Sequence, residues 1–342
     1  MVALRAQVAS AGVPPRALIT GISGQDGSYL AELLIAEGYE VVGLVRDPAG
    51  RDAGRDAVRG SGREAANLAG VVGRVRFVQG DLLDGAGLRA AVLEVAPDEL
   101  YHLAAPTFVP ASWEDPAQTM GAIAGATATV LAAARETGAR VFVASSSEIF
   151  GDAGESPQSE LSPCRPRTPY GVAKLAAHGL VGALRAGEGL FACSGIAYNH
   201  ESVRRPERFL PRKVTRGAAA IKLGLERELV LGDLDAVRDW CHARDVVRGA
   251  WLALRAEEPG DYVLASGVGR TVRELVETAF GCVGLEAEEW VRVDERFVRA
   301  PESTPQVGDP TLARRLLGWR AETSFAAMIA EMVEADLVAL RA

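Results

Sequence analysis

Short apolar segments alternate with helical patterns through the first two-thirds of this 342-residue chain, and this alternation limits the folds that it can adopt. The expected strands cover residues 17–20, 41–45, 75–79, 99–102 and 141–145, and a helix-like segment follows each of them. Repeated strand–helix–strand units build a parallel sheet with helices on both faces. We therefore expect an α/β protein with a Rossmann doubly wound parallel sheet and a smaller, mostly C-terminal lobe.

The first expected strand leads directly into a glycine-rich turn. An apolar helix predicted over residues 29–36 follows, with Gly38 as its C-terminal stop. Glycines in such a turn allow a tight bend, let the backbone approach a pyrophosphate and let helix and strand pack closely. The pyrophosphate then meets unpaired N–H groups at the positive end of the helix. The turn is predicted to bind a nicotinamide dinucleotide through Gly21, Ile22, Ser23, Gly24, Gln25, Asp26 and Gly27.

The end of the second expected strand bears on the choice between NAD and NADP. An acid at this place suits the ribose hydroxyls of NAD, whereas an arginine suits the 2′-phosphate of NADP. Arg46 favours NADP(H), but Asp47 would repel a phosphate if it pointed inward, so NAD(H) stays an alternative. Residues after the next two strands fit the adenine edge and the floor of the same site: Asp81, Leu82, Leu103, Ala104, Ala105 and Thr107.

Tyr170 and Lys174 lie four residues apart in a segment that is expected to be helical, so their side chains project from one face. The lysine ammonium is expected to lower the pKa of the phenol, so that Tyr170 can accept a proton from a sugar hydroxyl near neutral pH. The alternative is an ordinary surface pair, which the glycine turn upstream makes less favoured.

Ser146 and Glu148 follow the fifth expected strand. Residues two apart in an extended chain share a face, so both are expected to project together at the carboxyl edge of the sheet, where open α/β folds place their sites. Ser146 can hydrogen-bond a hydroxyl beside Tyr170. Glu148 offers a second acid or base, which loss of water from a sugar needs and simple epimerisation does not. The alternative for Glu148 is an acid that begins a helix.

Net charge, apolar runs and cysteine spacing limit the partners and the cellular compartment that we expect. The formal net charge of −8 disfavours nucleic acid or an anionic membrane as a partner. No run of about 20 apolar residues is evident, so no membrane-spanning segment is expected. Residues 1–16 lack the apolar core of a secretory signal. The four cysteines form no CxxC pair and have no histidine at metal-ligand spacing, which predicts buried free thiols, no metal site and a cytoplasmic location.

Several strings of residues, in one order along the chain, resemble extended short-chain dehydrogenases/reductases and, within them, the GDP-mannose 4,6-dehydratase family. They are ALITGISGQDGSYLAELL, SSSEIFG, ESPQSE, PYGVAK, LFACSGIAYNHES, LGDLDAVRDW and GDPTLARRLLGW. The resemblance implies that Ser146, Glu148, Tyr170 and Lys174 are catalytic and that His200 and Arg205 join the cofactor site. It also implies the residues that bind the nucleotide sugar: Thr107, Ser146, Glu148, Tyr170, Asn199, Lys213, Arg238, Arg299 and Glu302.

The implied activity is that of a hydro-lyase. A GDP-linked hexose, GDP-mannose in the first place, would lose water to give the GDP-4-keto-6-deoxy sugar, with the cofactor reduced and reoxidised in each turnover. Pro106, Gln118 and Ile123 depart from the family pattern, so a GDP-heptose or another NDP-sugar stays open as the substrate. An epimerase or reductase of the same fold competes with this activity, and so does a non-catalytic nucleotide-sugar sensor. The resemblance also implies a homo-oligomer, either a dimer or a tetramer.

The domain organisation follows from the same pattern. Residues 1–197 and about 238–266 are expected to form the dinucleotide-binding domain. Residues from about 198 to 237 and 267–342, where arginines are frequent, are expected to form the nucleotide-sugar-binding lobe. Residues 47–70 are charged and rich in glycine, which predicts a loop rather than a helix.

Overall fold

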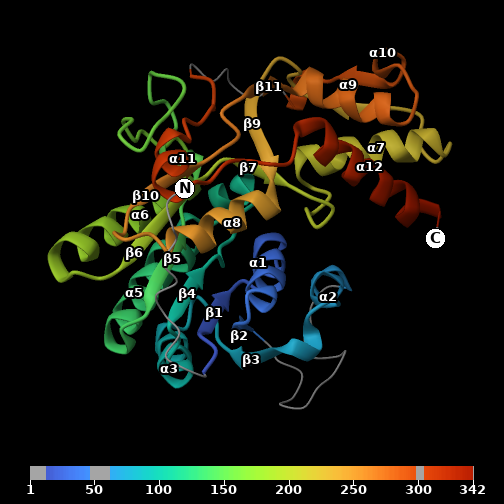
Figure 1. Ribbon diagram of the computed structural model, residues 1–342. Coiled ribbons are helices and arrows are strands. Elements are labelled where there is room, and N and C mark those ends of the chain that lie inside the picture. The colour runs from blue at the N-terminus through green and yellow to red at the C-terminus, as the bar shows by residue number, and fades with distance from the viewer. Residues whose placement is uncertain (1–12, 47–61, 298–303, 342) are drawn as a thin grey trace.

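The computed structural model describes residues 13–46, 62–297 and 304–341, with a seven-stranded parallel sheet at its centre (Figure 1). The strand order is β10-β6-β5-β4-β1-β2-β3. The strands are β1 (Arg16–Thr20), β2 (Glu40–Val45), β3 (Val75–Gln79), β4 (Glu99–His102), β5 (Arg140–Ala144), β6 (Ala192–Ala197) and β10 (Asp261–Leu264). The doubly wound fold is confirmed, and each predicted strand lies within about one residue of its observed bounds.

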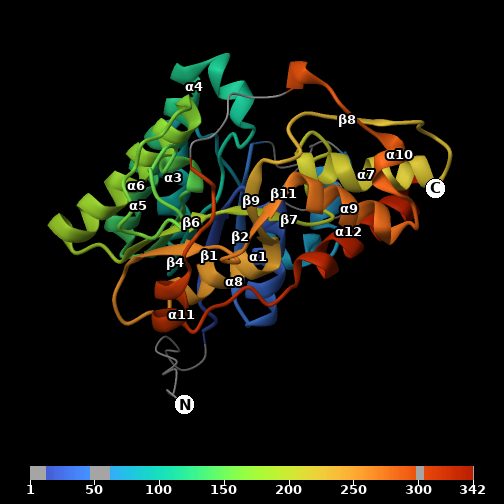
Figure 2. The same cartoon turned by 90° about the horizontal axis from the view of Figure 1, so that it is seen from above.

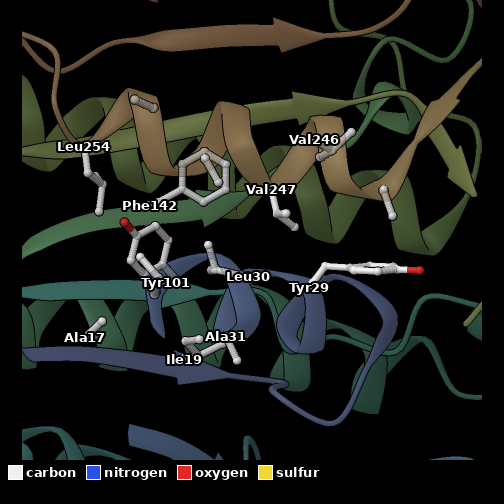
Figure 3. Close-up of a cluster of buried hydrophobic side chains, with 14 of the residues drawn as sticks. Ala17, Ile19, Tyr29, Leu30, Ala31, Tyr101, Phe142, Val246, Val247 and Leu254 are labelled. Carbon is white, nitrogen blue, oxygen red and sulfur yellow. The ribbon is translucent and has the colours of Figure 1, made fainter. Parts of the chain in front are cut away.

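Helices cover both faces of this sheet (Figures 1 and 2). One face packs against α1 (Gln25–Ala36), α8 (Ala243–Ala253) and α11 (Thr311–Leu317), and the other against α3 (Gly85–Val95), α5 (Ala126–Thr137) and α6 (Pro169–Glu188). Figure 3 shows the first core, where Leu30 and Val247 from the helices meet Tyr101 and Phe142 from the strands. Both faces of every central strand are buried, which is why the strands read as continuous apolar runs.

A smaller lobe is built mainly from the last third of the chain. It contains a sheet of order β11-β9-β7 and a pair β12-β8. These strands are β7 (Asn199–Glu201), β8 (Leu229–Leu231), β9 (Val237–His242), β11 (Gly269–Thr271) and β12 (Val291–Val293), and the helices are α7 (Leu210–Lys222), α9 (Val272–Cys282), α10 (Ala287–Trp290) and α12 (Phe325–Arg341). Val214, Leu275 and Met332 share its core. The exact domain boundaries stay a prediction. However, α11, assigned to the lobe from sequence, packs against α8 and β10, and β9, assigned mostly to the dinucleotide-binding domain, pairs with β7 and β11 of the lobe.

Short helices complete the described chain: α2 (Gly62–Leu68), η1 (Val72–Arg74), η2 (Val109–Trp113), α4 (Pro116–Met120), the π-helical turn η3 (Gly121–Gly125), η4 (Ser147–Ile149) and η5 (Glu295–Phe297). The helix α2 corrects part of the loop predicted over residues 47–70, of which 47–61 lie outside the described residues. Leu68 is buried in the core and the Asn67 amide donates to the Ser23 carbonyl at 3.0 Å, so tertiary contacts override the local glycine content.

Two expectations from composition need correction. The continuous helical run Pro116–Thr137 is long and apolar enough, by length and composition alone, to cross a membrane. Half of its most apolar window is buried, and its α5 part packs against α3 and α6, as in the core helix of a globular domain. All four cysteines are free, as predicted, but only Cys193 and Cys241 are buried. Cys164 is half-buried, and Cys282 is exposed at the end of α9.

Candidate active site

The glycine turn lies between β1 and α1, where the order of the sheet reverses from β1 to β4. Gly21 adopts a left-handed φ of +75°, and a Cβ there would lie 2.9 Å from the backbone of Ala104. A Cβ on Gly27 would lie 2.2 Å from the Gly21 carbonyl oxygen. Only glycine fits either position, so the turn closes tightly on the loop that follows β4.

This geometry fits a dinucleotide. Helix α1 begins at the turn with Gly24 as its N-cap, and among the described residues no side chain caps the N–H groups of its first turn. Such an uncapped helix end attracts a pyrophosphate. The crevice at the reversal point of a doubly wound sheet is also where such ligands bind. Thr20 at the end of β1 ties the two sides together: its hydroxyl lies 2.9 Å from His102 Nδ1 and accepts from the Ala104 N–H at 3.2 Å.

The segment after β6 is fastened to the first turn of α1. His200 Nε2 lies 2.9 Å from Asp26 Oδ2, across 174 residues of sequence. The Gln25 amide donates to the His200 carbonyl at 3.1 Å and accepts from the Ser202 hydroxyl at 2.8 Å. The family resemblance alone assigned His200 to the cofactor site, and the structure places it against the first turn of α1, beside the glycine turn. Arg205 pairs with Glu201 at 3.1 Å close by.

Charge at this junction is fixed by pairing. Burial alone would raise the pKa of Asp26, but the charge of His200 and its hydrogen bond outweigh burial and hold this pKa below its usual value. Burial alone would lower the pKa of His200, but Asp26 raises it by charge and hydrogen bond. The acid and the imidazole are therefore an ion pair within the glycine turn.

Ser146 and Glu148 come together in a different way from that predicted. Strand β5 ends at Ala144, and residues 147–149 form the 3₁₀ turn η4 rather than an extended chain. The Ser146 hydroxyl caps this turn by accepting from the Glu148 N–H at 3.3 Å. The extended chain predicted through Glu148 is therefore wrong, because the Ser146 hydroxyl accepts from a nearby N–H and the backbone turns there.

Helix α6 carries Tyr170 and Lys174 to the same edge of the sheet. Thr168 caps its first turn by accepting from the Gly171 N–H at 2.9 Å and donates to Glu148 Oε2 at 3.4 Å. Tyr170 is nearly buried and hydrogen-bonds Ser146. Lys174 Nζ donates to the Ala144 carbonyl at 2.7 Å and lies 5.8 Å from the centre of the Tyr170 ring.

The expected lowering of the Tyr170 pKa is wrong for the described chain. Burial raises the pKa of Tyr170 to about 12, with the Ser146 hydrogen bond lowering it and the Glu148 charge raising it further. Burial also lowers the pKa of Lys174 to about 8, against the attraction of Asp26. Desolvation therefore exceeds the effect of the ammonium, whose position is fixed by a carbonyl of β5 rather than by the phenol.

One family model, described as GDP-mannose 4,6 dehydratase, matches residues 18–332. The chain belongs to the GDP-mannose 4,6-dehydratase family. It is 43% identical to the GDP-mannose 4,6-dehydratase of Sinorhizobium fredii, over 95% of this chain and 97% of that protein. It is 41% identical to GDP-mannose 4,6 dehydratase 2 of Arabidopsis thaliana, over 95% of this chain and 88% of that one.

Among solved structures, the dTDP-glucose 4,6-dehydratase of Streptomyces venezuelae with NAD bound has a TM-score of 0.78 and 27% identity. The match covers 94% of this chain and 96% of that structure. Both lobes of this member of the GDP-mannose 4,6-dehydratase family therefore have counterparts in a dehydratase of known structure.

The nucleotide-sugar positions implied by the family resemblance lie mostly on the lobe. Asn199 begins β7, and Arg238 lies on β9, which pairs with β7. Lys213 is exposed in the first turn of α7, where its ammonium donates to the Val230 carbonyl at 2.7 Å. Arg299 and Glu302 lie outside the described residues.

The other implied cofactor positions lie at the carboxyl ends of β2, β3 and β4. Arg46 is exposed directly after β2, and Asp47 lies outside the described residues. The remaining positions after β3 and β4, which are half-buried or exposed, are Asp81, Leu82, Leu103, Ala105 and Thr107.

Sequence reasoning missed three residues of this family member that support the site. Thr168 links the start of α6 to Glu148, and Thr-Pro before an apolar helical pattern is a recognisable N-cap signal. Ser202 and Arg204 brace α1, the latter by donating to Ser28 Oγ at 3.0 Å and by stacking 3.8 Å from the centre of the Tyr29 ring. No local sequence pattern indicates Ser202 or Arg204, because their partners lie 177 and 176 residues away.

Proposed function

We propose that the chain is a hydro-lyase that converts GDP-mannose into its GDP-4-keto-6-deoxy derivative with a nicotinamide cofactor. The observation that carries the proposal is the gathering of Ser146, Glu148 and Tyr170 at the carboxyl edge of the sheet that also holds the glycine turn. The names of the relatives in Sinorhizobium fredii and Arabidopsis thaliana support the same substrate.

The cofactor would be held by the glycine turn and the N-terminus of α1, with the loop after β4 as its floor. A bound nicotinamide would supply a store for one hydride and, when oxidised, a positive charge that favours an ionised phenol. The chain's own residues then have to bind the sugar, move its protons and exclude water.

Tyr170 is proposed to take the proton of the sugar C4 hydroxyl. Because the product keeps the C4 ketone, this proton is not returned to C4 but is given to C5, which regains a hydrogen at the end of a turnover. Its hydrogen bond to Ser146 places a second hydroxyl beside the phenol oxygen, so a substrate hydroxyl can be held between them. With a pKa of about 12, Tyr170 starts protonated, so this exchange needs local positive charge. Lys174, with a pKa of about 8, is mostly charged at neutral pH and contributes to it.

Glu148 is proposed to remove the C5 proton and to donate a proton to the hydroxyl that leaves from C6. A C4 ketone makes the C5 hydrogen acidic, and one carboxyl group can serve both steps in turn. Thr168 orients this carboxyl by donating to Oε2. An epimerase needs no such group, which favours the dehydratase over that alternative.

The preference for NADP(H) over NAD(H) is also proposed. It is supported by the exposed Arg46 directly after β2, since a guanidinium suits a 2′-phosphate. NAD(H) stays the alternative, and competitive binding of the two cofactors decides between them.

The test is to incubate the full chain with a panel of NDP-sugars and catalytic NADP⁺, and to look by mass spectrometry for loss of one water. We expect the GDP-mannose sample to give the dehydrated product without net use of cofactor. Dehydration of a GDP-heptose alone would correct the substrate. Stoichiometric consumption of NADPH would select a reductase, and an unchanged panel would contradict the proposal.

We also propose that the chain forms a homo-oligomer, a dimer or a tetramer. Trp113, Met120 and Val172 are exposed and line an apolar groove of about 520 Å³. The groove adjoins the apolar helical run Pro116–Thr137, and the same face of a second copy can cover the unburied half. Light scattering on the parent and on Trp113→Glu tests this: we expect an oligomer that the substitution weakens, and a monomeric parent would contradict it.

A further inference from the structure

The hydrogen bonds of His200 suit its protonated form, and its pKa is raised by the charge of Asp26 and their hydrogen bond. Nδ1 lies 2.6 Å from the Tyr198 carbonyl oxygen, and Nε2 lies 2.9 Å from a carboxylate oxygen of Asp26. A carbonyl oxygen can only accept, and so can an ionised carboxylate, so both ring nitrogens must donate. Asp26 is ionised because the charge of His200 and its hydrogen bond outweigh burial and hold the pKa of this acid below its usual value, and its other oxygen accepts from the Gln25 amide at 3.1 Å. His200 is therefore an imidazolium cation.

The position of Asp26 indicates a role for the positive charge of His200. Asp26 lies in the first turn of α1, directly after the glycine turn. A carboxylate there is attracted by the helix dipole but would repel the pyrophosphate that the same helix end is suited to bind. Both side chains are largely shielded from water, so the repulsion would be only weakly screened.

We infer that protonated His200 is a positioning residue that makes the glycine turn competent for a dinucleotide by cancelling the charge of Asp26. The inference rests on the proposed function only in taking the turn as a dinucleotide site. Because the cancelling charge is a titratable proton, dinucleotide affinity should fall at alkaline pH as His200 becomes neutral.

The other titratable and charged groups around His200 do not supply the positive charge that its proton provides. On the neighbouring elements these groups are Asp26 on α1, Tyr170 and Lys174 on α6, Glu201 on β7, Arg205 after it, Cys241 on β9, and Arg244 and Asp245 on α8. Arg205 also lowers the pKa of Asp26, but less than His200 does, and it is paired with Glu201. Arg244 is paired with Glu331 at 3.0 Å. Burial raises the pKa of the Cys241 thiol well above its usual value, so it stays neutral. Lys174 titrates at about pH 8 and needs a control.

The fold holds His200 in place without the ion pair. The Gln25 amide donates to its backbone carbonyl, the Ser202 hydroxyl donates to Gln25, and β7 pairs with β9 over the whole strand. Removing the charge of His200 therefore changes the electrostatics of the turn more than its shape.

The test measures the dissociation constants of NADP⁺ and NAD⁺ by calorimetry between about pH 6 and pH 10, without sugar. The proteins are the full-length parent, His200→Gln, Asp26→Asn and the double variant, all freed of co-purified dinucleotide. The Gln side chain keeps a donor toward Asp26 but carries no charge. Because every variant keeps Lys174, a change of affinity with pH that persists in His200→Gln belongs to Lys174 and not to His200.

We expect parent affinity to fall at alkaline pH, and His200→Gln to bind about tenfold more weakly at neutral pH with a flatter profile. Asp26→Asn on the His200→Gln background should recover most of this loss, which a merely structural role would not produce. A His200→Gln protein with the parent's affinity and profile, or additive losses in the double variant, would overturn the inference. A parent that binds dinucleotide with this profile yet dehydrates no sugar would sink the proposed function alone.

Discussion

The two ends of the central sheet each hold an acid that is largely shielded from water, but they hold it in opposite states. At the carboxyl edge, Asp26 is paired with the His200 cation and its pKa lies below the usual value. At the amino edge, Glu99 begins β4 and is nearly buried, and its pKa is raised to about 7, mainly by burial. Its oxygens accept from the phenol of Tyr101 at 2.7 Å and from that of Tyr39 at 3.2 Å.

The difference lies in what each acid faces. Glu99 is enclosed by phenols, with Arg255 at 3.5 Å on one side, and these groups are satisfied by one another. At the carboxyl edge, Asp26 lies in the first turn of α1 and Glu148 lies in the turn η4. The N–H groups at the uncapped N-terminus of α1 can bind a ligand. The amino edge stabilises the fold, whereas the carboxyl edge carries the candidate active site, as expected for open α/β proteins.

The sharpest way to break this contrast is to neutralise one acid at each edge. Glu148→Gln should lower the dehydration rate by about 100- to 10,000-fold, because it removes the only acid and base proposed for elimination. Tyr170→Phe should do the same for the oxidation step. Steady-state assays with GDP-mannose measure both effects, and Glu94→Gln on the exposed face of α3 is the matched control. A Glu148→Gln enzyme with parental turnover would remove that residue from the mechanism.

At the amino edge we expect an effect on stability rather than on activity. Glu99 has a folded-state pKa of about 7 against an ordinary value of 4.5. The acid therefore stabilises the fold fully below about pH 4.5, and this contribution is lost as the pH rises through 7. The stability of Glu99→Gln relative to the parent should accordingly rise by about 3 kcal/mol between pH 5 and pH 8.

Urea unfolding of both proteins across that range gives the measurement. Glu40→Gln is the control, because Glu40 forms a half-exposed pair with Arg16 on the same edge. Such a pair contributes less than about 1 kcal/mol. If the difference between parent and Glu99→Gln does not change with pH, Glu99 is ionised in the fold and the contrast between the edges fails.

Replacing a glycine of the glycine turn should weaken dinucleotide binding, whereas replacing a glycine within a helix should not, although this effect is smaller than those above. Gly27→Ala places a Cβ 2.2 Å from a backbone oxygen, so the turn must shift. Strain of about 1–3 kcal/mol should weaken dinucleotide binding by about 5- to 150-fold in fluorescence titrations. Gly179→Ala on α6, where the new Cβ meets nothing within 4 Å, should bind as the parent does. Equal affinities for the two variants would show that the turn does not carry the cofactor site.

The smallest expected effect concerns cofactor choice. Arg46→Gln should weaken NADP⁺ binding by about tenfold and leave NAD⁺ binding nearly unchanged, because it removes one charged contact at the edge of the site. Calorimetry with each cofactor measures the ratio, and Arg76→Gln on β3 is an exposed-arginine control. Tighter binding of NAD⁺ by the parent would reverse the proposed preference.

The sequence by itself determined the first five strands, the glycine turn and the Tyr170–Lys174 pair. These features follow from local causes: apolar periodicity, the left-handed φ that Gly21 must adopt, and helical spacing. Each cause acts within a few residues and can be read along the chain.

Only the tertiary structure decided the charge states and the partners. His200 meets Asp26 across 174 residues, and burial rather than the nearby ammonium sets the pKa of Tyr170. Helix α2 and the 3₁₀ turn at Glu148 also went against the sequence reasoning, since packing and a local cap determine them. Burial and distant contacts depend on how the whole chain packs, and no local pattern of residues records them.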